Sequence, residues 1–512
     1  MRKFLLFLCM LFALFGNAFA QKQYDTELVV VGSGVAGLTA AAYASDQGVK
    51  TILLEKLPNV GGQLIIIEGT FAVGTKTQRQ DMVGLTKDEA FNQIMDYSGW
   101  RANAAYNKKY VDNSASTLEW LQKKGVEMEG VTTDTPDGNR VYHMYKSGFP
   151  GKNYIDSMMK VIKENNNIVL TETPAKSLIT DKKGNVTGVI AENADGEEIR
   201  VNAKAVLLAT GSFVNNAEIL QKYNPELVKG IKHISPLKNM GDGIVMGQKI
   251  GADVANMNTM IFESAVPVNM DYHEIHDNPA RLDAYMILKT PSIWLNKNGK
   301  RFVNEALSGD YTVVSNSLVA NGSELVVIMD EEIRKDIMFG AGSHANYFTL
   351  YDRGQLVKHF DEAVQDGMKK GYAFKANSIE ELAKKMNMDV AIVKASVERY
   401  NKLAEKGEDV DFGKDVEQLK PITHAPYYGF IGMNTICDAA GGLKIDENAQ
   451  VINTEGYNIP GLYAAGATTG GMYGTNYPYI MPGYASGSAM NAGRFAVEHV
   501  MKTILHRQVK SF

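Results

Sequence analysis

Residues 27–56 constrain the fold of this chain more than any other stretch: ELVVVGSGVAGLTAAAYASDQGVKTILLEK. A short β-branched run leads into Gly32, Gly34 and Gly37 in the spacing G-x-G-x-x-G. An alanine-rich helical segment and a second apolar strand ending at Glu55 follow. This order predicts a βαβ unit. Glycines at those places allow a tight turn, close approach of the backbone to a pyrophosphate, and close packing of helix on strand. The stretch therefore predicts a dinucleotide site rather than a chance glycine turn.

The start of the predicted helix and the end of the second strand supply further candidate contacts. Val35 and Ala36 would offer free backbone N–H groups to phosphates. Glu55 can accept both hydrogen bonds of a ribose, and Lys56 follows it. Three segments favour FAD over NAD: the double glycine at 61–62, AVLLATGSF at 205–213 and IPGLYAAGATTGG at 459–471. The FAD-binding residues predicted in them are Gly61, Gly62, Ala209, Thr210, Gly211, Gly466 and Ala467.

Residues 1–20, MRKFLLFLCMLFALFGNAFA, combine two basic residues, an apolar run and a small-residue ending. This pattern predicts a signal peptide that is removed, so that the mature chain begins near Gln21 in a periplasmic or other extracytoplasmic location. We expect no stable membrane anchor, because the apolar run covers only residues 4–16 and a span needs about 20. Cys437 is then the single cysteine of the mature chain, which permits no intramolecular disulfide.

Length and charge set broad limits. The chain has 512 residues and a formal net charge of -5. It is long enough for a large core divided over two domains, and its charge leaves no basic footprint for nucleic acid. Asp181 to Gly184 is predicted to turn a hairpin. Apolar side chains recur at helical spacing between residues 378 and 404, which predicts core-facing helices. They are Leu382, Met386, Val390, Val393 and Val397.

The glycine-rich segments, together with NKNGKRFVNE at 296–305 and a helical stretch at 379–414, carry a resemblance. They are similar to the fumarate reductase and succinate dehydrogenase flavoprotein family, in particular its soluble fumarate-reductase-like members and the 3-ketosteroid dehydrogenases. The resemblance covers nearly the whole mature chain. It implies an α/β fold: a Rossmann-like FAD-binding domain, residues 24–260 and 436–507, with an inserted α+β substrate-capping domain, residues 261–435.

The resemblance also extends to the flavin contacts of the last segment. Gly483 and Ser486 are expected to contact FAD, since a glycine lets the backbone approach a flavin closely. One place departs from the family. Ala467 stands where members commonly carry an acid for the ribityl chain, and the hydroxyls of Thr468 and Thr469 are the candidate substitutes.

Three cations that the soluble fumarate reductases use for their substrate are missing. The arginine that follows RFVNE and delivers the proton is replaced by Gly309. The histidine before the double glycine is replaced by Asp438, and the arginine of the C-terminal TN-R-x-GG pattern by Tyr477. Burying a dicarboxylate without paired cations costs several kcal/mol per charge. We therefore expect that fumarate and succinate are not substrates.

The stretch GGMYGTNYPYIMPGYASG, residues 470–487, contains Tyr473, Tyr477, Tyr479 and Tyr484. Such side chains suit a flat, neutral ligand with a carbonyl or a phenol. The alternative is that they pack the loop against the sheet. That reading is as good for any one of them but weaker for all four, because binding residues concentrate on such loops. The 3-ketosteroid dehydrogenases carry a tyrosine in a similar Tyr-Pro-Gly segment, and a second one near the place of Tyr311.

The expected reaction is hydride transfer from reduced flavin N5 to the β-carbon of an alkene conjugated to a carbonyl. A protein acid would protonate the α-carbon. Candidate acids are Tyr477, Tyr311 and Asp310, and Asp438 is a further candidate catalytic residue. The segment YHMYKSGFPG, residues 142–151, is a candidate substrate wall.

Two other functions remain open at this level: dehydrogenation of a ketosteroid-like substrate, and a flavin protein that only binds or transfers electrons. The chain has no CxxCH sequence and no second dinucleotide fingerprint. A separate redox protein is therefore expected to exchange electrons with the flavin. His273 and His276 stand three apart, but no further ligand pattern supports a metal site.

Overall fold

A parallel sheet forms around the predicted βαβ unit. The computed structural model describes residues 22–133, 139–146, 150–225, 232–233, 239–271, 274–275, 277–339 and 357–511; the predicted signal peptide lies outside them. Within these residues the main sheet has the strand order β18-β19-β9-β1-β2-β6, with β8 beside β9 and β7 beside β8. The bounds are β1 (Lys22–Val31), β2 (Thr51–Leu54), β6 (Ile168–Leu170), β7 (Ala175–Thr180), β8 (Val186–Glu192), β9 (Glu198–Leu208), β18 (Gln450–Ile452) and β19 (Asn458–Ala464).

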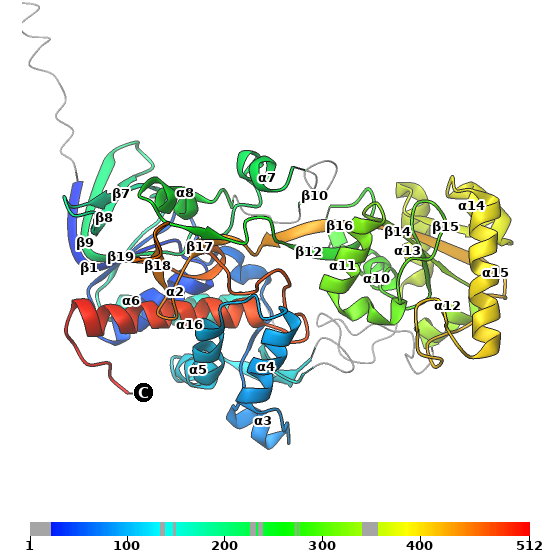
Figure 1. Cartoon of the computed structure of the whole chain (residues 1–512), viewed down its shortest axis with the longest axis horizontal. Helices are drawn as coiled ribbons and strands as arrows, with labels where there is room; N and C mark the ends of the chain where they lie inside the picture. Colours follow the sequence, from blue (N-terminus) through cyan, green and yellow to red (C-terminus); the bar gives the residue numbers. More distant parts are fainter. Residues whose placement is uncertain are drawn as a thin grey trace, which may run out of the picture.

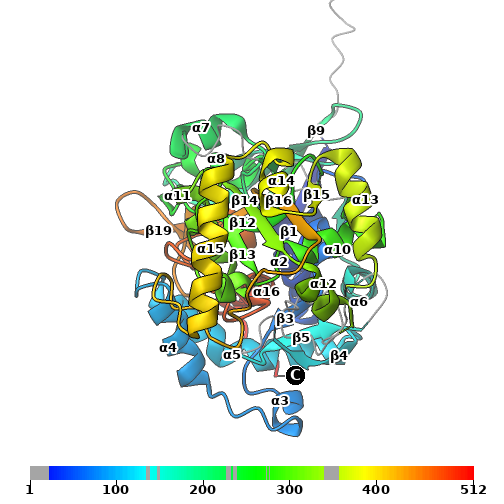
Figure 2. The same ribbon diagram turned by 90° about the vertical axis from the view of Figure 1, so that its right-hand side faces the viewer.

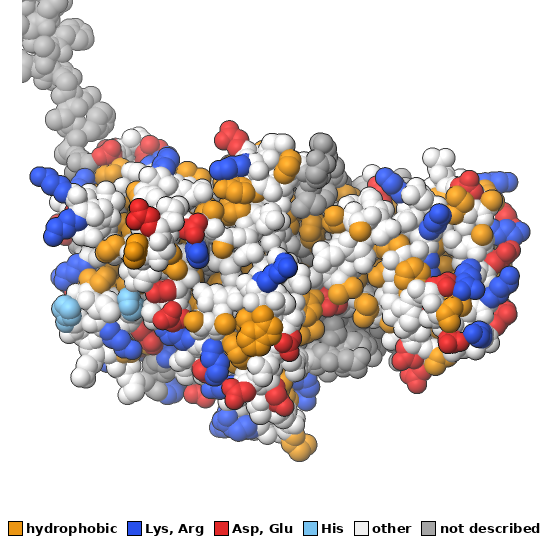
Figure 3. Space-filling model, in the orientation of Figure 1, with side chains coloured by type: hydrophobic (Ala, Val, Ile, Leu, Met, Phe, Trp, Pro, Cys, Tyr) orange, Lys and Arg blue, Asp and Glu red, His pale blue; other side chains and the backbone are white. Residues whose placement is uncertain are grey.

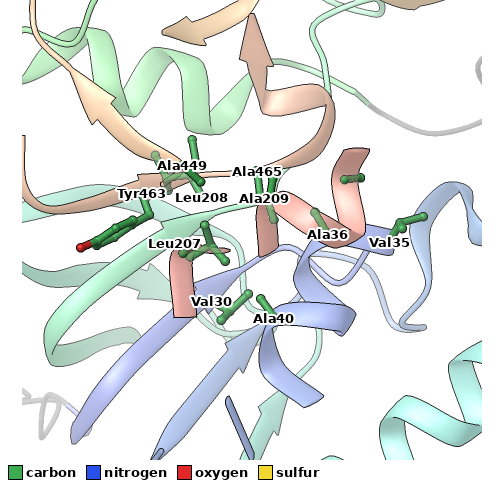
Figure 4. Close-up of a cluster of buried hydrophobic side chains, with 14 of the residues drawn as sticks. Val30, Val35, Ala36, Ala40, Leu207, Leu208, Ala209, Ala449, Tyr463 and Ala465 are labelled. Atoms are coloured by element: carbon green, nitrogen blue, oxygen red, sulfur yellow. The ribbon is translucent and has the colours of Figure 1, made fainter. Parts of the chain in front are cut away.

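The central strands are buried on both faces, which explains their unbroken apolar sequences. Val29 of β1 pairs in parallel with Ile52 of β2 and with Val206 of β9. Figure 4 shows Val30 of β1 beside Ala40 of the following helix, within one cluster of buried side chains. The predicted Rossmann-like α/β fold is confirmed. The hairpin at Asp181 is confirmed as well, because Asp181 and Gly184 close the turn between β7 and β8.

The helices around the main sheet are α2 (Val35–Asp46), η1 (Gly62–Ile66), α3 (Lys76–Gln80), α4 (Lys87–Tyr97), α5 (Ala104–Lys123), α6 (Pro150–Glu164), α7 (Ala217–Tyr223), α8 (Asp242–Lys249), η3 (Gly466–Thr468), α16 (Tyr484–His499) and η4 (Val500–Ile504). Two small sheets flank it: β3 (Gly69–Phe71), β5 (Tyr142–Tyr145) and β4 (Met128–Thr132); and β11 (Val254–Ala255), β17 (Gly442–Lys444) and β20 (Thr469–Gly470). Helix α2 packs against α16 and α6. The described helices include none that could cross a membrane.

A second, mostly antiparallel sheet forms the capping domain, on the right of Figure 1. Its strands are β10 (Lys232–His233), β12 (Met260–Pro267), β13 (Ile293–Leu295), β14 (Glu324–Met329), β15 (Ala373–Ala376) and β16 (Tyr427–Ala439). Its helices are α10 (Pro279–Ile287), η2 (Glu305–Gly309), α11 (Tyr311–Ala320), α12 (Glu331–Phe339), α13 (Phe360–Lys370), α14 (Ile379–Lys385) and α15 (Val390–Lys406). Figure 2 shows α15 on the outer face of this sheet.

The predicted helices of the 378–404 region are confirmed as α14 and α15. Leu382, Met386, Val393 and Val397 are buried in the capping core, and Val390 packs against its edge. Strands β12 and β16 run between the two domains (Figure 1). The predicted domain limits near residues 260 and 435 therefore fall on this strand pair rather than on loops, and they stay predictions. Figure 3 shows acidic and basic side chains interspersed over both domains.

A buried ionic network holds the segment that leads into α11. Arg301 donates to the carboxylates of Glu305 and Asp409, at 2.8 and 2.7 Å through Nη2, and all three side chains are buried. Burial raises the pKa of Asp409, but the hydrogen bonds from Arg301 and from backbone N–H groups outweigh this and lower it to about 2. Glu305 also accepts the backbone N–H of Trp294. The network thereby holds Glu305, the first residue of η2.

Candidate active site

A long cavity of about 1170 Å³, counted with its opening to solvent, lies at the carboxyl ends of β1 and β9 and at the start of α2. Its walls come from both ends of the chain. Thirteen of the sixteen predicted cofactor residues line it: Gly32, Gly34, Val35, Ala36, Glu55, Lys56, Gly62, Ala209, Thr210, Gly211, Gly466, Ala467 and Ser486. Parallel sheets bind ligands at this edge.

Three predicted cofactor residues do not line the cavity but shape its walls. A Cβ on Gly37 would lie 1.8 Å from the carbonyl oxygen of Gly32, so this glycine lets helix α2 approach the strand. Gly61 has φ +121° and donates its N–H to the carbonyl of Ser33. Gly483 has φ +76°, and a Cβ there would lie 2.6 Å from the backbone nitrogen of Phe71. We find Gly483 packed against β3, not facing the cavity.

The start of α2 fits a phosphate. Gly34 is the N-cap, no side chain caps the helix, and a Cβ on Gly34 would meet no atom within 4 Å. Val35 and Ala36, the first residues of the helix, line the cavity, so the partial positive charge of the helix end lies at its wall. Glu55 is held at the same edge, where Oε2 accepts from the backbone and hydroxyl of Ser33 and Oε1 accepts from the N–H of Leu57.

Five further polar residues line the cavity that sequence reasoning missed: Ser33, Gln63, Thr173, Asn239 and Asp242. Ser33 lies between two motif glycines and could have been named from the motif. Asp242 belongs to no motif; it begins α8 and pairs with Lys56 at 2.8 Å. Only the fold brings these two charges together.

The threonines expected to replace the ribityl acid do something else. Thr468 and Thr469 are both buried, and neither lines the cavity. The Thr469 hydroxyl donates to the carbonyl of Gly466 at 2.7 Å, and the Thr468 hydroxyl lies 3.3 Å from the carbonyl of Gly211. Their hydroxyls hold the loop that carries Ala467. The expectation that they substitute for the acid is therefore wrong.

Asp438 lies in the cavity wall at the end of β16, paired with Ile261 of β12, which also lines the cavity. Burial raises the pKa of its carboxyl to about 6, despite the opposing influence of Ser212, its neighbour Ala439 N–H and Gln63. This carboxyl therefore changes charge close to physiological pH. Among the described residues that line the cavity, the charged side chains are Glu55, Lys56, Asp242 and Asp438.

The tyrosine loop, residues 470–487, forms a chain of edge-to-face and tilted rings. Ring centroids are 5.3 Å apart for Tyr473 and Tyr477, 4.8 Å for Tyr477 and Tyr479, and 5.4 Å for Tyr473 and Tyr484. Tyr473 lines the cavity. Tyr484 is fully buried and donates to Asn107, so it belongs to the core. The packing alternative is therefore confirmed for Tyr484, and a ligand-binding role for Tyr473 stays a prediction.

Tyr477 lies where α16 begins. Its hydroxyl oxygen accepts the backbone N–H of Ala485 at 3.1 Å, and Ala485 lines the cavity. No side chain caps this helix, whose N-cap is Gly483. The positive end of a helix favours negative charge on a nearby oxygen. Tyr477 itself does not line the cavity and meets its wall through Ala485, so its catalytic role stays a prediction.

Tyr311 and Asp310 lie at the contact between the capping domain and the tyrosine loop. Tyr311 packs on Tyr479 with centroids 4.8 Å apart and accepts a hydrogen bond from Lys289. Asp310 caps α11 through the N–H of Val313 and accepts from the Tyr97 hydroxyl at 2.6 Å. These bonds give Asp310 a structural task, and neither it nor Tyr311 lines the cavity.

Of the candidate substrate wall, residues 142–151, positions 147–149 lie outside the described part of the chain. His143 is buried, its Nε2 lies 2.8 Å from the Thr75 hydroxyl and its Nδ1 lies 3.0 Å from the Val141 carbonyl. Burial lowers the pKa of His143 to about 4, so it stays neutral. His273 and His276 lie outside the described residues, and no group of possible metal ligands is found in the described part of the chain.

The family of the chain follows from a match over most of its length. Residues 27–479 match the family model described as FAD binding domain. The chain belongs to the fumarate reductase and succinate dehydrogenase flavoprotein family. It is therefore a FAD-dependent oxidoreductase acting on CH–CH bonds, and the alternative of a flavin protein without turnover is set aside. The residues that line the cavity fit FAD: the start of α2 would hold the pyrophosphate and Glu55 the adenosine ribose, with the Ala467 loop next to the flavin.

Two curated relatives are reductases. The chain is 33% identical to the vinyl phenol reductase of Lactiplantibacillus plantarum over 93% of this chain and 97% of that protein. It is 29% identical to the urocanate reductase of Eggerthella lenta over 88% of this chain and 71% of that protein.

Solved structures show the same fold. The open conformation of a flavocytochrome c3 fumarate reductase matches with a TM-score of 0.71 at 24% identity, over 95% of this chain and 79% of that chain. The 3-ketosteroid-Δ4-(5α)-dehydrogenase of Rhodococcus jostii matches with a TM-score of 0.76 at 23% identity, over 95% and 98%.

Two glycine variants should separate cofactor binding from folding. Gly34→Ala adds a methyl where no protein atom is near, so the apoprotein should keep its melting temperature while FAD binds about tenfold or more weakly. Gly37→Ala forces the helix off the strand and should destabilise the apoprotein by about 1–3 kcal/mol. Thermal unfolding of the apoproteins and fluorescence titration with FAD measure both. Equal melting temperatures for the two variants would contradict this assignment.

Asp438 should control the binding of anionic ligands. Because its pKa is about 6, the carboxyl is neutral below that pH and charged above it. The Kd of the oxidised flavoprotein for an aryl acrylate anion should therefore rise with pH above 6, by at most about tenfold per pH unit. In Asp438→Asn the Kd should be independent of pH over that range. Titration followed by flavin absorbance measures it, and parallel curves in the two proteins would refute the role.

Proposed function

We propose that this protein reduces the activated C=C bond of a neutral or aromatic alkene conjugated to a carbonyl or to a phenol ring, and that fumarate is not its substrate. The observation that carries the proposal is the composition of the cavity wall. Its flavin-side part, next to Ala467 and Ser486, contains Tyr473 and Asp438 and no cationic side chain among the described residues. A flat ring can pack there, whereas a dicarboxylate lacks a counter-charge.

Charge arguments support the same conclusion. The cavity cation, Lys56, is paired with Asp242 beside Glu55, at the nucleotide edge. Asp438 adds a negative charge above pH 6. Desolvating the two carboxylates of a dicarboxylate substrate against this wall costs several kcal/mol each. The similarity to a vinyl phenol reductase also supports an aromatic substrate.

The roles of the tyrosines follow from their places. FAD, when bound and reduced, supplies the hydride. Tyr477, at the positive end of α16, would hold a carbonyl oxygen and stabilise the negative charge that develops on it. With a vinylphenol it would hold the phenol oxygen and position the ring. Burial raises the pKa of Tyr473 and of Tyr479, so both remain neutral phenols. They would pack against the ring of the substrate. Tyr311 would serve as the acid for the α-carbon. The second candidate function is dehydrogenation of a ketosteroid-like substrate, and the same tyrosines would serve it.

Two further statements belong to the proposal. We infer that a separate redox protein reduces the flavin, supported by the lack of a haem-attachment or second dinucleotide motif in the sequence. We also infer an extracytoplasmic location, supported by the signal-peptide pattern of residues 1–20.

A substrate panel tests the proposed reaction. The reduced flavoprotein, mixed anaerobically with each candidate acceptor, should be reoxidised rapidly by a vinylphenol or a neutral aryl enone. Fumarate should leave it reduced, because the wall offers no counter-charge. Urocanate, cinnamate-type acids and a steroid enone complete the panel, and flavin absorbance reports each reaction. Rapid reoxidation by fumarate would sink the proposal, and reduction of the oxidised protein by a saturated ketosteroid would favour the second candidate.

Removal of the Tyr477 hydroxyl should lower turnover selectively. Tyr477→Phe keeps the ring contacts but loses the oxygen at the α16 end, so kcat should fall about 10²- to 10³-fold with FAD content unchanged. Tyr463→Phe is the matched control, since its hydroxyl contacts His499, at the opposite end of α16 from Ala485. Steady-state kinetics on the acceptor found in the panel measure both. Wild-type rates in Tyr477→Phe would remove this residue from the mechanism.

A further inference from the structure

A buried ammonium group lies in the capping domain, directly behind the tyrosine loop. Lys289 has a side chain that is 1% exposed. Its Nζ donates to Glu263 Oε1 at 2.8 Å and to the hydroxyl oxygens of Tyr285 and Tyr311. Tyr285 also donates to Glu263. We call these four residues the Lys289 cluster.

The partners match what an ammonium needs. Lys289 has three N–H donors, and Glu263, Tyr285 and Tyr311 provide three acceptors. Its nitrogen also lies 3.9 Å from the ring centroids of both tyrosines. A buried lysine without such partners would cost several kcal/mol. The carboxylate of Glu263, 2.8 Å from the Lys289 Nζ, provides the counter-charge.

The cluster is connected to the proposed substrate side through Tyr311. This ring packs on Tyr479, and the neighbouring Thr312 hydroxyl donates to the carbonyl of Tyr477 at 2.8 Å. At its other end, Glu263 stands two residues after Ile261 in β12, and Ile261 lines the FAD cavity. The cluster therefore borders the contact between the two domains on two sides, through β12 and through α11.

A second buried lysine in the same domain provides a comparison. Lys414 is fully buried, lies 3.3 Å from Glu305 and donates to the Tyr400 hydroxyl at 2.9 Å. It also donates to the carbonyl of Pro291. Its contacts are all within the capping domain, where it belongs to the network of Arg301. Lys414 is thus, like Lys289, a buried lysine that contacts a glutamate and a tyrosine hydroxyl. Its tyrosine, Tyr400, does not reach the tyrosine loop.

We infer that the Lys289 cluster delivers the proton of the reaction, with Tyr311 as the group that gives it to the substrate carbon and Lys289 as the group that restores it. The inference rests on the proposed function for the substrate. The O–H bond of Tyr311 breaks as a C–H bond forms at the α-carbon, which carries the electron pair left by hydride addition to the β-carbon. An N–H proton of Lys289 then returns to the phenolate oxygen. Solvent restores that proton through Glu263, whose side chain is 10% exposed.

The physical advantage lies in the charge of Lys289. An ammonium that donates to a phenolic oxygen stabilises the phenolate that remains after proton transfer. Without it, a buried phenol is a weak acid near neutral pH. The titratable groups around Lys289 come from five elements. They are Glu263 of β12, Cys437 of β16, Tyr285 of α10, Tyr311 of α11 and Tyr479 of the tyrosine loop. Burial raises the pKa of Cys437, so its thiol stays protonated.

Kinetics of FAD-loaded variants test the inference. Tyr311→Phe should lower kcat about 10²- to 10⁴-fold, the usual contribution of a general acid, with KM, FAD content and flavin reduction by dithionite unchanged. Lys289→Met should lower kcat and change its pH profile, and Lys289→Arg, which keeps the charge, should recover part of the rate. Lys414→Met is the matched control and should lower stability while leaving the pH profile of kcat intact.

A second readout does not need a substrate. The ultraviolet difference titration between wild type and Tyr311→Phe isolates the ionisation of Tyr311. The same difference measured in the Lys289→Met protein should appear at higher pH, because the ammonium no longer stabilises the phenolate. An unchanged titration, wild-type turnover in Tyr311→Phe, or identical kinetic losses in Lys289→Met and Lys414→Met would each overturn the inference. If no acceptor reoxidises the flavin, the proposed function fails, and the titration alone decides whether Lys289 acts on Tyr311.

Discussion

The architecture depends on how closely helix α2 approaches its neighbours. Two contacts set this distance: a Cβ on Gly32 would lie 2.2 Å from the carbonyl oxygen of Ala209, and one on Gly493 would lie 2.6 Å from the carbonyl oxygen of Ala36. Glycine thus lets the turn before α2 approach the residue after β9, and lets α16 approach α2. This packing brings residues from both ends of the chain to one edge of the sheet, and the FAD cavity is the space left between them.

Much of this could be predicted because it is local. The glycine motif, the strands beside it and the acid at Glu55 lie within one stretch of about 30 residues, and the physics of each acts over short distances. The hairpin at Asp181 and the helical spacing of the 378–404 region are local in the same sense. Many residues of the cavity wall were therefore accessible from residue types and spacing.

The remaining features depend on contacts between distant segments. No pattern joins Lys289 to Glu263 and Tyr311, since the three come from different elements and only the capping sheet brings them together. The roles of Thr468 and Thr469 were misjudged for a related reason: a hydroxyl near a cofactor loop can satisfy that loop's own backbone instead of the ligand. Asp310 follows the same rule, because the start of a helix consumes its carboxylate.

Strands β12 and β16 have a consequence for how such a protein can diversify. They connect a cofactor cradle built from backbone and glycines to a capping domain, and the contact between the two is built from side chains of α11 and of the tyrosine loop. Replacing side chains on that surface leaves the backbone contacts of the cradle intact. Substrate preference and cofactor affinity are therefore separately adjustable traits in this architecture, and lineages that share the cradle can acquire different chemistry at the cap.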